Sequence, residues 1–143
     1  MYKSILIASD GSQLADKAVE NGLALAKAIS ARVVAVTVQP LYPYYSLDPG
    51  FEKSNELDQV LQEQSKKLLG GVAAKATAAG VPCETLAVSA DQPYEAIIDT
   101  AKKKACDLIV MASHGRSGMT AVVLGSQAQK VLTHSTIPVL VYR

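Results

Sequence analysis

The chain has 143 residues, and 49% of them are hydrophobic, which is enough for one domain over residues 1–143 with a buried core. Its net charge is only +1, and aromatic residues make up 5% of the chain, with one Phe and no Trp. Dedicated nucleic-acid proteins carry a basic excess or stacking aromatic side chains, so this composition predicts no nucleic-acid partner.

The sequence also predicts neither a membrane span nor a secreted disulfide framework. No apolar run approaches the roughly eighteen residues of a membrane-spanning helix. The apolar start of the chain reaches Asp10 too early for a signal peptide. Cys83 and Cys106 lie far apart and form no CxxC pair, so we expect reduced, partly buried thiols. These features favour a cytoplasmic protein without membrane insertion.

Short apolar runs alternate with helical patterns along the first half of the chain. Residues 5–8 predict a buried strand, and Ser12 is a good N-cap for a helix that runs to Ser30. Residues 33–38 predict a second strand. The stretch 39–50 contains three prolines and three tyrosines and is typical of a loop. The whole connection, residues 39–53, is the longest and is therefore the candidate for a lid or a partner surface.

The second half continues the alternation. Its predicted elements are, in order, a helix at 54–79, a strand at 84–89, a helix at 93–104, a strand at 107–112, a helix at 126–134 and a strand at 137–142. Gly70-Gly71 inside the long helix could mark a kink or a break, because glycine is a poor helix former.

This strict β-α alternation predicts an α/β fold. Short connections between strands favour a five-stranded parallel sheet covered by helices on both faces, which is a three-layer α/β/α sandwich with Rossmann-like topology. In such sheets the ligand lies outside the carboxyl ends of the strands, where the strand order reverses. The stretches that follow residues 8, 38 and 112 end strands at that edge.

Residues 111–126 form the most informative motif. They read Met-Ala-Ser-His-Gly-Arg-Ser-Gly-Met-Thr-Ala-Val-Val-Leu-Gly-Ser, between a predicted strand and a predicted helix. Small residues before a helix N-terminus favour a phosphate, because the backbone can approach it and N–H groups point at it. The motif lacks both the Walker A ending and the G-x-G-x-x-G pattern. Its glycines could alternatively be turn residues that merely start a helix.

Few other side chains suggest chemistry. Asp10 follows the first strand, where a carboxylate could contact a ribose, an adenine amino group or a divalent ion, or could cap the next helix. His114 and His134 have no ligand-spaced His, Cys or acid nearby, which disfavours a metal or catalytic role. No G-x-S-x-G elbow is present, so a serine hydrolase is disfavoured.

With these residues in hand, the whole chain resembles the universal stress protein family. Nucleotide-binding members of that family carry G-x2-G-x9-G-[ST] after the fourth strand. Here Ala112 stands at the first position, Gly115 at the second, and Gly125-Ser126 follow after nine residues. The opening Ile-Leu-Ile-Ala-Ser-Asp-Gly-Ser and the ending Ile-Pro-Val-Leu-Val are also similar to the family. The resemblance implies the adenine-nucleotide alpha-hydrolase-like version of the fold.

The resemblance implies ATP at the carboxyl ends of the strands, with any Mg²⁺ bound through its phosphates. Asp10 would lie near the adenine or ribose, and Val38 would offer its backbone to the adenine edge. The remaining residues implied at the nucleotide are Ala8, Ser9, Met111, Ala112, His114, Gly115, Arg116, Gly125, Ser126 and Gln127, the last three facing the phosphates. Ala112 ends a strand, where φ should be negative, so we expect alanine to be tolerated and ATP to bind.

The resemblance also implies a homodimer formed through the last strand, by Val139, Leu140, Val141 and Tyr142. The expected function is that of a dimeric sensor or regulator in a stress response, with an unidentified protein partner and at most slow ATP hydrolysis. Two alternatives remain open. One is a dimeric interaction protein of the same fold that does not bind ATP, and the other is a hydrolase acting on nucleotides.

Overall fold

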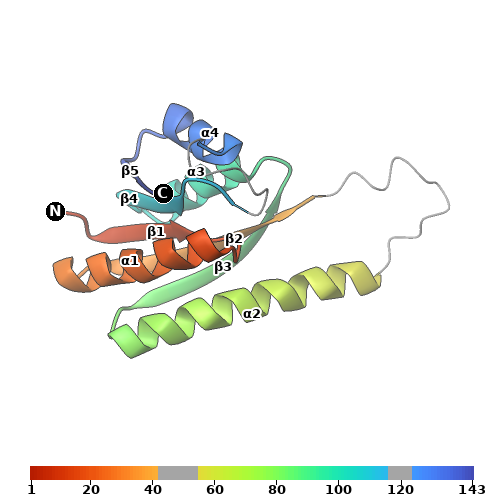
Figure 1. Ribbon diagram of the computed structural model, residues 1–143, viewed down its shortest axis with the longest axis horizontal. Coiled ribbons are helices and arrows are strands. Elements are labelled where there is room, and N and C mark those ends of the chain that lie inside the picture. The colour runs from red at the N-terminus through yellow and green to blue at the C-terminus, as the bar shows by residue number, and fades with distance from the viewer. Residues whose placement is uncertain (42–54, 116–123) are drawn as a thin grey trace.

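The computed structural model describes residues 1–41, 55–115 and 124–143, and within them five parallel strands form one sheet (Figure 1). The strand order is β3-β2-β1-β4-β5. The elements are β1 (Ser4–Ala8), α1 (Gln13–Ile29), β2 (Arg32–Pro40), α2 (Asn55–Ala79), β3 (Cys83–Ala90), α3 (Pro93–Lys103), β4 (Leu108–Ala112), α4 (Ser126–His134) and β5 (Val139–Tyr142). The predicted α/β class and parallel sheet are therefore confirmed.

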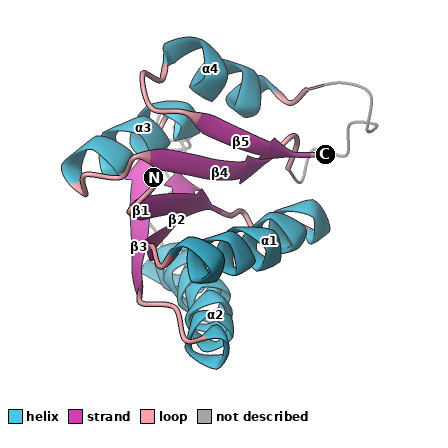
Figure 2. Cartoon of the chain, turned by 90° about the vertical axis from the view of Figure 1, so that its left-hand side faces the viewer, coloured by secondary structure: helices cyan, strands magenta, loops and turns pink. Residues whose placement is uncertain are grey.

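Helices cover both faces of the sheet (Figure 2). Along β1, Ile5 and Ile7 pack in one hydrophobic cluster with α1 and α2, whereas Leu6 and Ala8 pack in a second cluster with α3 and α4. Successive side chains of a strand point to opposite faces, so a strand buried on both faces has an unbroken apolar sequence. This explains why residues 5–8 form a continuous apolar run and confirms the three layers.

The strand order reverses beside β1. β1 pairs with β2 on one side, with Leu6 opposite Val34, and with β4 on the other, with Leu6 opposite Ile109. The chain thus builds β2 and β3 outward from one edge of β1, and then β4 and β5 outward from the other. The helices that follow β1 and β4, α1 and α4, consequently pack on opposite faces of the sheet, and a crevice opens at the carboxyl end of these two strands.

Two predicted boundaries, the end of β2 and the start of β5, differ from the structure by two residues. Gln39 and Pro40 belong to β2 and not to a loop, because β2 continues to pair with β3 as far as Pro40 opposite Ala90. The pairing with β1 ends at Val36, so Pro40 lies where the strand has one open edge and its missing N–H costs no ladder hydrogen bond. Ile137 precedes β5, because its N–H donates to Ser135 Oγ at 2.9 Å in a local turn.

The helix α2 is continuous through Gly70-Gly71, so the alternative of a break is wrong. Both glycines are exposed, and a Cβ added at either would meet no atom within 4 Å. The helix is instead held by its opposite face, where Leu69, Val72 and Ala76 are buried against the sheet. Tertiary packing therefore outweighs the poor helix propensity of the two glycines.

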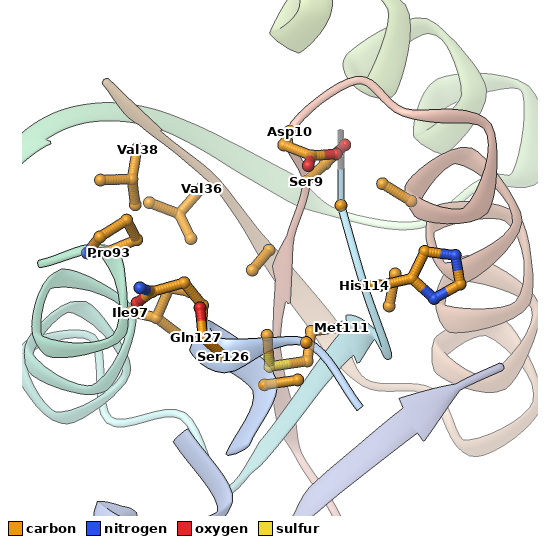
Figure 3. Close-up of a pocket in the computed structure, with 16 residues that line it drawn as sticks. Ser9, Asp10, Val36, Val38, Pro93, Ile97, Met111, His114, Ser126 and Gln127 are labelled. Carbon is orange, nitrogen blue, oxygen red and sulfur yellow. The ribbon is translucent and has the colours of Figure 1, made fainter. Parts of the chain in front are cut away.

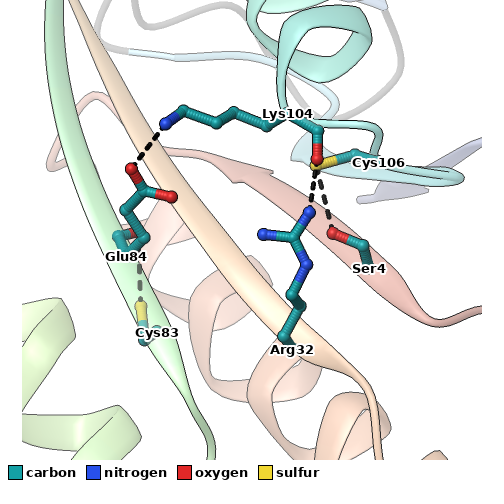
Figure 4. Close-up of polar contacts among 6 residues, drawn as sticks. All are labelled: Ser4, Arg32, Cys83, Glu84, Lys104 and Cys106. Carbon is teal, nitrogen blue, oxygen red and sulfur yellow. Dashed lines mark hydrogen bonds and ion pairs between the residues drawn. The ribbon is translucent and has the colours of Figure 1, made fainter.

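Polar contacts tie strands and helices together at the amino end of the sheet (Figure 4). Lys104 Nζ donates to Glu84 Oε1 at 2.7 Å, and the carbonyl of Lys104 accepts from the Arg32 guanidinium. Cys83 and Cys106 pack in clusters on opposite faces of the sheet and are free thiols, as expected. Burial raises the pKa of both thiols, which keeps them protonated and poorly nucleophilic.

Asp107 joins the start of β4 to the start of β1. Its carboxylate accepts the N–H groups of Lys3, at 3.0 Å, and Ser4, at 3.1 Å. Burial raises the pKa of this carboxyl, but the hydrogen bonds outweigh it and bring the pKa below its ordinary value of 3.8. Asp107 therefore stabilises the fold above that pH, and this stabilisation is lost as the pH falls through the lowered pKa.

Among residues 1–41, 55–115 and 124–143, no helix is long and apolar enough to cross a membrane.

Replacing Gly70 or Gly71 by alanine should raise the free energy of unfolding by about 0.5–1 kcal/mol at each site, as measured by urea denaturation. The reason is the higher helix propensity of alanine together with the open space around both positions. Gly22→Ala on α1 is the matched control, because its Cβ would lie 2.7 Å from Ile7 Cδ1 in the core. The Gly22→Ala variant should gain less stability than the Gly70 and Gly71 variants, or should lose stability. Unchanged or lower stability of the Gly70 and Gly71 variants would contradict this explanation of α2.

Candidate functional site

A pocket of about 240 Å³ lies at the carboxyl end of the sheet (Figure 3). It is bounded by the ends of β1, β2 and β4 and by the first turns of α3 and α4. Its lining residues are Ala8, Ser9, Asp10, Ala15, Val36, Val38, Pro93, Ile97, Met111, Ala112, His114, Gly115, Gly125, Ser126, Gln127 and Ala128. The pocket occupies the place that the reversal of strand order creates.

One side of the pocket is apolar. Val36 and Val38 project from β2, since alternate residues of a strand share a face, and Pro93 and Ile97 project from α3 (Figure 3). Met111 of β4 lies deeper and is 7% exposed. Such a wall without charged side chains suits a flat, weakly polar group such as a nucleotide base.

The pocket also contains the N-terminus of α4. Gly125 is the N-cap residue and offers no side-chain cap. The N–H groups of Ser126, Gln127 and Ala128 lie in the first turn, where no carbonyl of the same helix can accept them. All three residues border the pocket. These N–H groups and the positive end of the helix dipole together favour an anion such as a phosphate.

Gly125 is required for this arrangement for a steric reason. Its φ is −63°, which any residue can adopt, but a Cβ would lie 3.0 Å from the Ser113 carbonyl oxygen and 3.2 Å from His114 Cα. The Gly125 N–H also donates to that carbonyl at 2.6 Å. The start of α4 is therefore held tightly against the residues that follow β4, and a side chain at position 125 would push the two apart.

Asp10 and Gly115 bring the loops after β1 and β4 together. A Cβ at Gly115 would overlap Asp10 Oδ2, so only glycine lets the carboxylate lie where it does. Asp10 Oδ1 also accepts the N–H of Ser12 at 2.9 Å, and Gly11 between them has a φ of +80° that favours glycine. Asp10 thus holds the turn before α1, without being the N-cap of that helix, and borders the pocket.

Ser12 in turn accepts the N–H of Ala15 at 3.2 Å and caps α1, as the sequence predicts.

Ala112 has no positive φ, as expected for a strand end. Although it borders the pocket, it packs against the cluster on the α1 and α2 face, which contains Ile7 and Val110. The apolar wall of the pocket, which includes Met111, lies on the other face of the sheet. The methyl group of Ala112 is thus directed away from that wall.

The two histidines differ in environment. His114 borders the pocket, and its Nδ1 lies 3.1 Å from Ser113 Oγ. His134 is in the last turn of α4 and stacks on the Tyr94 ring at 5.2 Å between centroids. In the described part of the chain, no group of three or more His, Cys, Asp and Glu side chains could hold a metal ion.

The structure brings the predicted nucleotide-site residues together around this pocket, except Arg116, which lies outside the described residues. Five lining residues are not predicted by the sequence pattern: Ala15, Val36, Pro93, Ile97 and Ala128. Val36 could have been found from its two-residue spacing to Val38. Pro93 and Ile97 could not, because their place depends on how α3 packs beside α4.

The four predicted dimer residues form β5, which is an edge strand of the sheet. Val110 of β4 pairs with Leu140 on one side of β5. Leu140 is 37% exposed.

Fold and pocket together define a class: doubly wound α/β proteins with a ligand crevice at the switch point of a 3-2-1-4-5 sheet. The model of the universal stress protein family matches residues 1–143. A universal stress protein of Thermus aquaticus, in the 3′ region of QAH/OAS sulfhydrylase, is 38% identical over 144 residues that cover all of both chains. The chain belongs to the universal stress protein family.

Solved structures share the fold. The structure of protein MJ0577 of Methanocaldococcus jannaschii has a TM-score of 0.85 and 28% identity, covering 99% of this chain and 96% of that one. A universal stress protein in complex with cAMP has a TM-score of 0.75 and 22% identity, covering 99% and 97%. One from Archaeoglobus fulgidus in complex with dAMP has a TM-score of 0.72 and 19% identity, covering 99% and 98%.

The contact of Asp10 with Gly115 predicts a non-additive pair of substitutions. Gly115→Ala should lower the free energy of unfolding by about 1–3 kcal/mol, because its methyl group displaces the carboxylate. In an Asp10→Ala background the same substitution should cost much less, since the overlapping oxygen is gone. Gly125→Ala is the control, because its Cβ meets the backbone of Ser113 and Asp10→Ala cannot relieve it. Equal costs of Gly115→Ala in both backgrounds, measured by urea denaturation, would refute the contact.

Proposed function

We propose that this protein is an ATP-binding universal stress protein. The observation that carries the proposal is the pairing, in one pocket, of an apolar wall with the uncapped N-terminus of α4. A ligand that fills both parts needs a flat, weakly polar group and a phosphate in one molecule, as a nucleotide has. The complexes of related folds with cAMP and dAMP support an adenine nucleotide.

The pocket suggests how each part of ATP is held. The adenine would lie against Val36, Val38 and Ile97, with the backbone of Val38 facing its edge. The ribose would lie near Asp10, whose carboxylate can accept hydrogen bonds from hydroxyl groups. The phosphates would accept the N–H groups of Ser126 and Gln127.

Charge favours a bound Mg²⁺ with the nucleotide. The described lining residues include no Lys or Arg, and Asp10 is acidic. The phosphates of ATP carry several negative charges, which a divalent ion on their oxygens would offset. We therefore propose that ATP binds as its Mg²⁺ complex, with the ion held chiefly by phosphate oxygens and not by a set of protein ligands.

The biological role that follows is sensing or regulation in the cytoplasm. A homodimer that pairs β5 across a two-fold axis would extend the sheet and cover its open edge. ATP can shift the protein between two conformations only if it binds them with different affinities. Such a shift would change the dimer or a surface for a regulatory protein. The helix α4 borders the pocket at its N-terminus and is followed directly by β5, so it offers a physical link between the site and the sheet edge.

Fast hydrolysis is not expected. Among the described residues of this site, the contact of Ser113 with His114 is the pairing that most resembles a nucleophile and its base. However, Ser113 is 3% exposed and is not among the residues that border the pocket, which disfavours it as a nucleophile toward a bound phosphate. We therefore favour a binding protein with at most slow ATPase activity over a nucleotide hydrolase.

Titration of the purified protein with ATP and Mg²⁺ in a calorimeter tests the proposal, and saturable binding is the expected result. Gly125→Val should abolish binding because its side chain meets Ser113 and His114 and displaces the start of α4. Circular dichroism should show that the variant keeps its fold. Gly71→Ala, on the far helix α2, is the control that should bind like the original protein.

The absence of both heat and a thermal shift at millimolar ATP would overturn the proposal. It would leave the second candidate, a dimeric interaction protein of the same fold that does not bind ATP.

A further inference from the structure

The first turn of α3 is capped by a side chain from α4. Pro93 at the first helical position has no N–H, and the N-cap residue Gln92 makes no side-chain cap. The Glu95 N–H turns back to the Gln92 carbonyl at 3.1 Å. The remaining donor, the Tyr94 N–H, bonds to Gln127 Oε1 at 3.0 Å. Gln127 therefore supplies the acceptor that the sequence of α3 itself does not.

Both ends of this hydrogen bond border the pocket. Pro93 and Ile97 form the α3 part of the apolar wall, and Gln127 follows the N-cap of α4 by two residues. Figure 3 shows Gln127 reaching toward Pro93 and Ile97. Because an N–H needs an acceptor, the carboxamide is oriented with Oε1 toward Tyr94. The side chain of Gln127 is thus engaged with α3, while its backbone N–H faces the phosphate side.

Contacts on the outer side of the same helix pair support this geometry. Lys130 Nζ lies 5.5 Å from the centre of the Tyr94 ring and donates to Gln92 Oε1 at 3.4 Å. The His134 ring stacks on the Tyr94 ring, with 5.2 Å between their centroids. Tyr94 also donates its hydroxyl to Glu95 at 3.1 Å. These outer groups hold the helices side by side, whereas the hydrogen bond of Gln127 joins the two first turns that line the pocket.

We propose that Gln127 is a positioning residue that sets the distance between the base wall on α3 and the phosphate site on α4. This inference rests on the proposed function. It adds the hydrogen bond that would let one ligand contact both the apolar wall and the N-terminus of α4. If the hydrogen bond is lost, the first turn of α3 shifts while the N–H groups of α4 remain. A ligand that spans both halves should then bind more weakly, whereas one that uses only α4 should not.

The test compares Gln127→Met with two matched variants. Methionine keeps the size and the backbone N–H but removes the acceptor. Gln127→Glu keeps an acceptor for Tyr94 and adds a negative charge. Gln129→Met makes the same change at an exposed position of α4. Amide hydrogen exchange of Tyr94, followed by NMR, reports the bond without any ligand, and titrations with Mg²⁺-ATP and with inorganic tripolyphosphate report binding.

We expect the Tyr94 amide to exchange about tenfold faster in Gln127→Met and at the original rate in the other two variants. Gln127→Met should weaken the binding of ATP about fivefold and leave the binding of tripolyphosphate unchanged. Gln127→Glu should weaken both ligands by the same factor, because its charge repels phosphate in either. A merely structural role would change both ligands alike in Gln127→Met.

Unchanged Tyr94 exchange in Gln127→Met, or equal weakening of ATP and tripolyphosphate by it, would overturn the inference. Failure of the proposed function is distinguishable, because the unsubstituted protein would then bind no ATP. In that case the positioning role is overturned with it, and faster Tyr94 exchange in Gln127→Met would leave Gln127 as a cap of α3 alone.

Discussion

The approach of the Asp10 carboxylate to Gly115 is the constraint on which the site depends. The two residues follow β1 and β4, the strands between which the sheet order reverses. Parallel strands bring their carboxyl ends to one edge, but they do not by themselves bring the following loops into contact. A glycine at 115 allows that contact because a side chain there would occupy the place of the carboxylate.

The other parts of the pocket follow from this point outward. Gly125 holds the start of α4 against the carbonyl of Ser113, so the N–H groups of the first turn of α4 lie beside the residues that follow β4, Ser113 and His114. Gln127 then fixes the start of α3 relative to α4. The sheet beneath is buried on both faces and has close contacts such as that of Gly22 with Ile7, so the loops stand on a tightly packed support.

Much of the fold could be predicted because its strands are buried on both faces and therefore read as apolar runs. The end of β2 could not, since Pro40 remains in the strand only through pairing with β3, which is distant in sequence. The continuity of α2 depends likewise on which face packs, and Gly70-Gly71 lie on the exposed one. Local residue preferences describe neither kind of long-range contact.

In the site too, some features could be predicted from the local sequence, whereas others depend on contacts between distant residues. Loop residues such as Gly115 and Gly125 could be predicted to lie together, because a motif of fixed spacing joins a strand to a helix. The reason for each glycine was not evident, since both have ordinary backbone angles and are required by neighbours. The α3 wall and its bond to Gln127 depend on the packing of two helices, for which the sequence carries no local signal.

The central claim is that one nucleotide spans the apolar wall and the N-terminus of α4. A crystal structure of the protein grown with saturating Mg²⁺-ATP tests it most directly. The account predicts density for adenine beside Val38 and Ile97, and for phosphates at the N–H groups of Ser126 and Gln127. An empty pocket, or ATP bound at another surface, would contradict it.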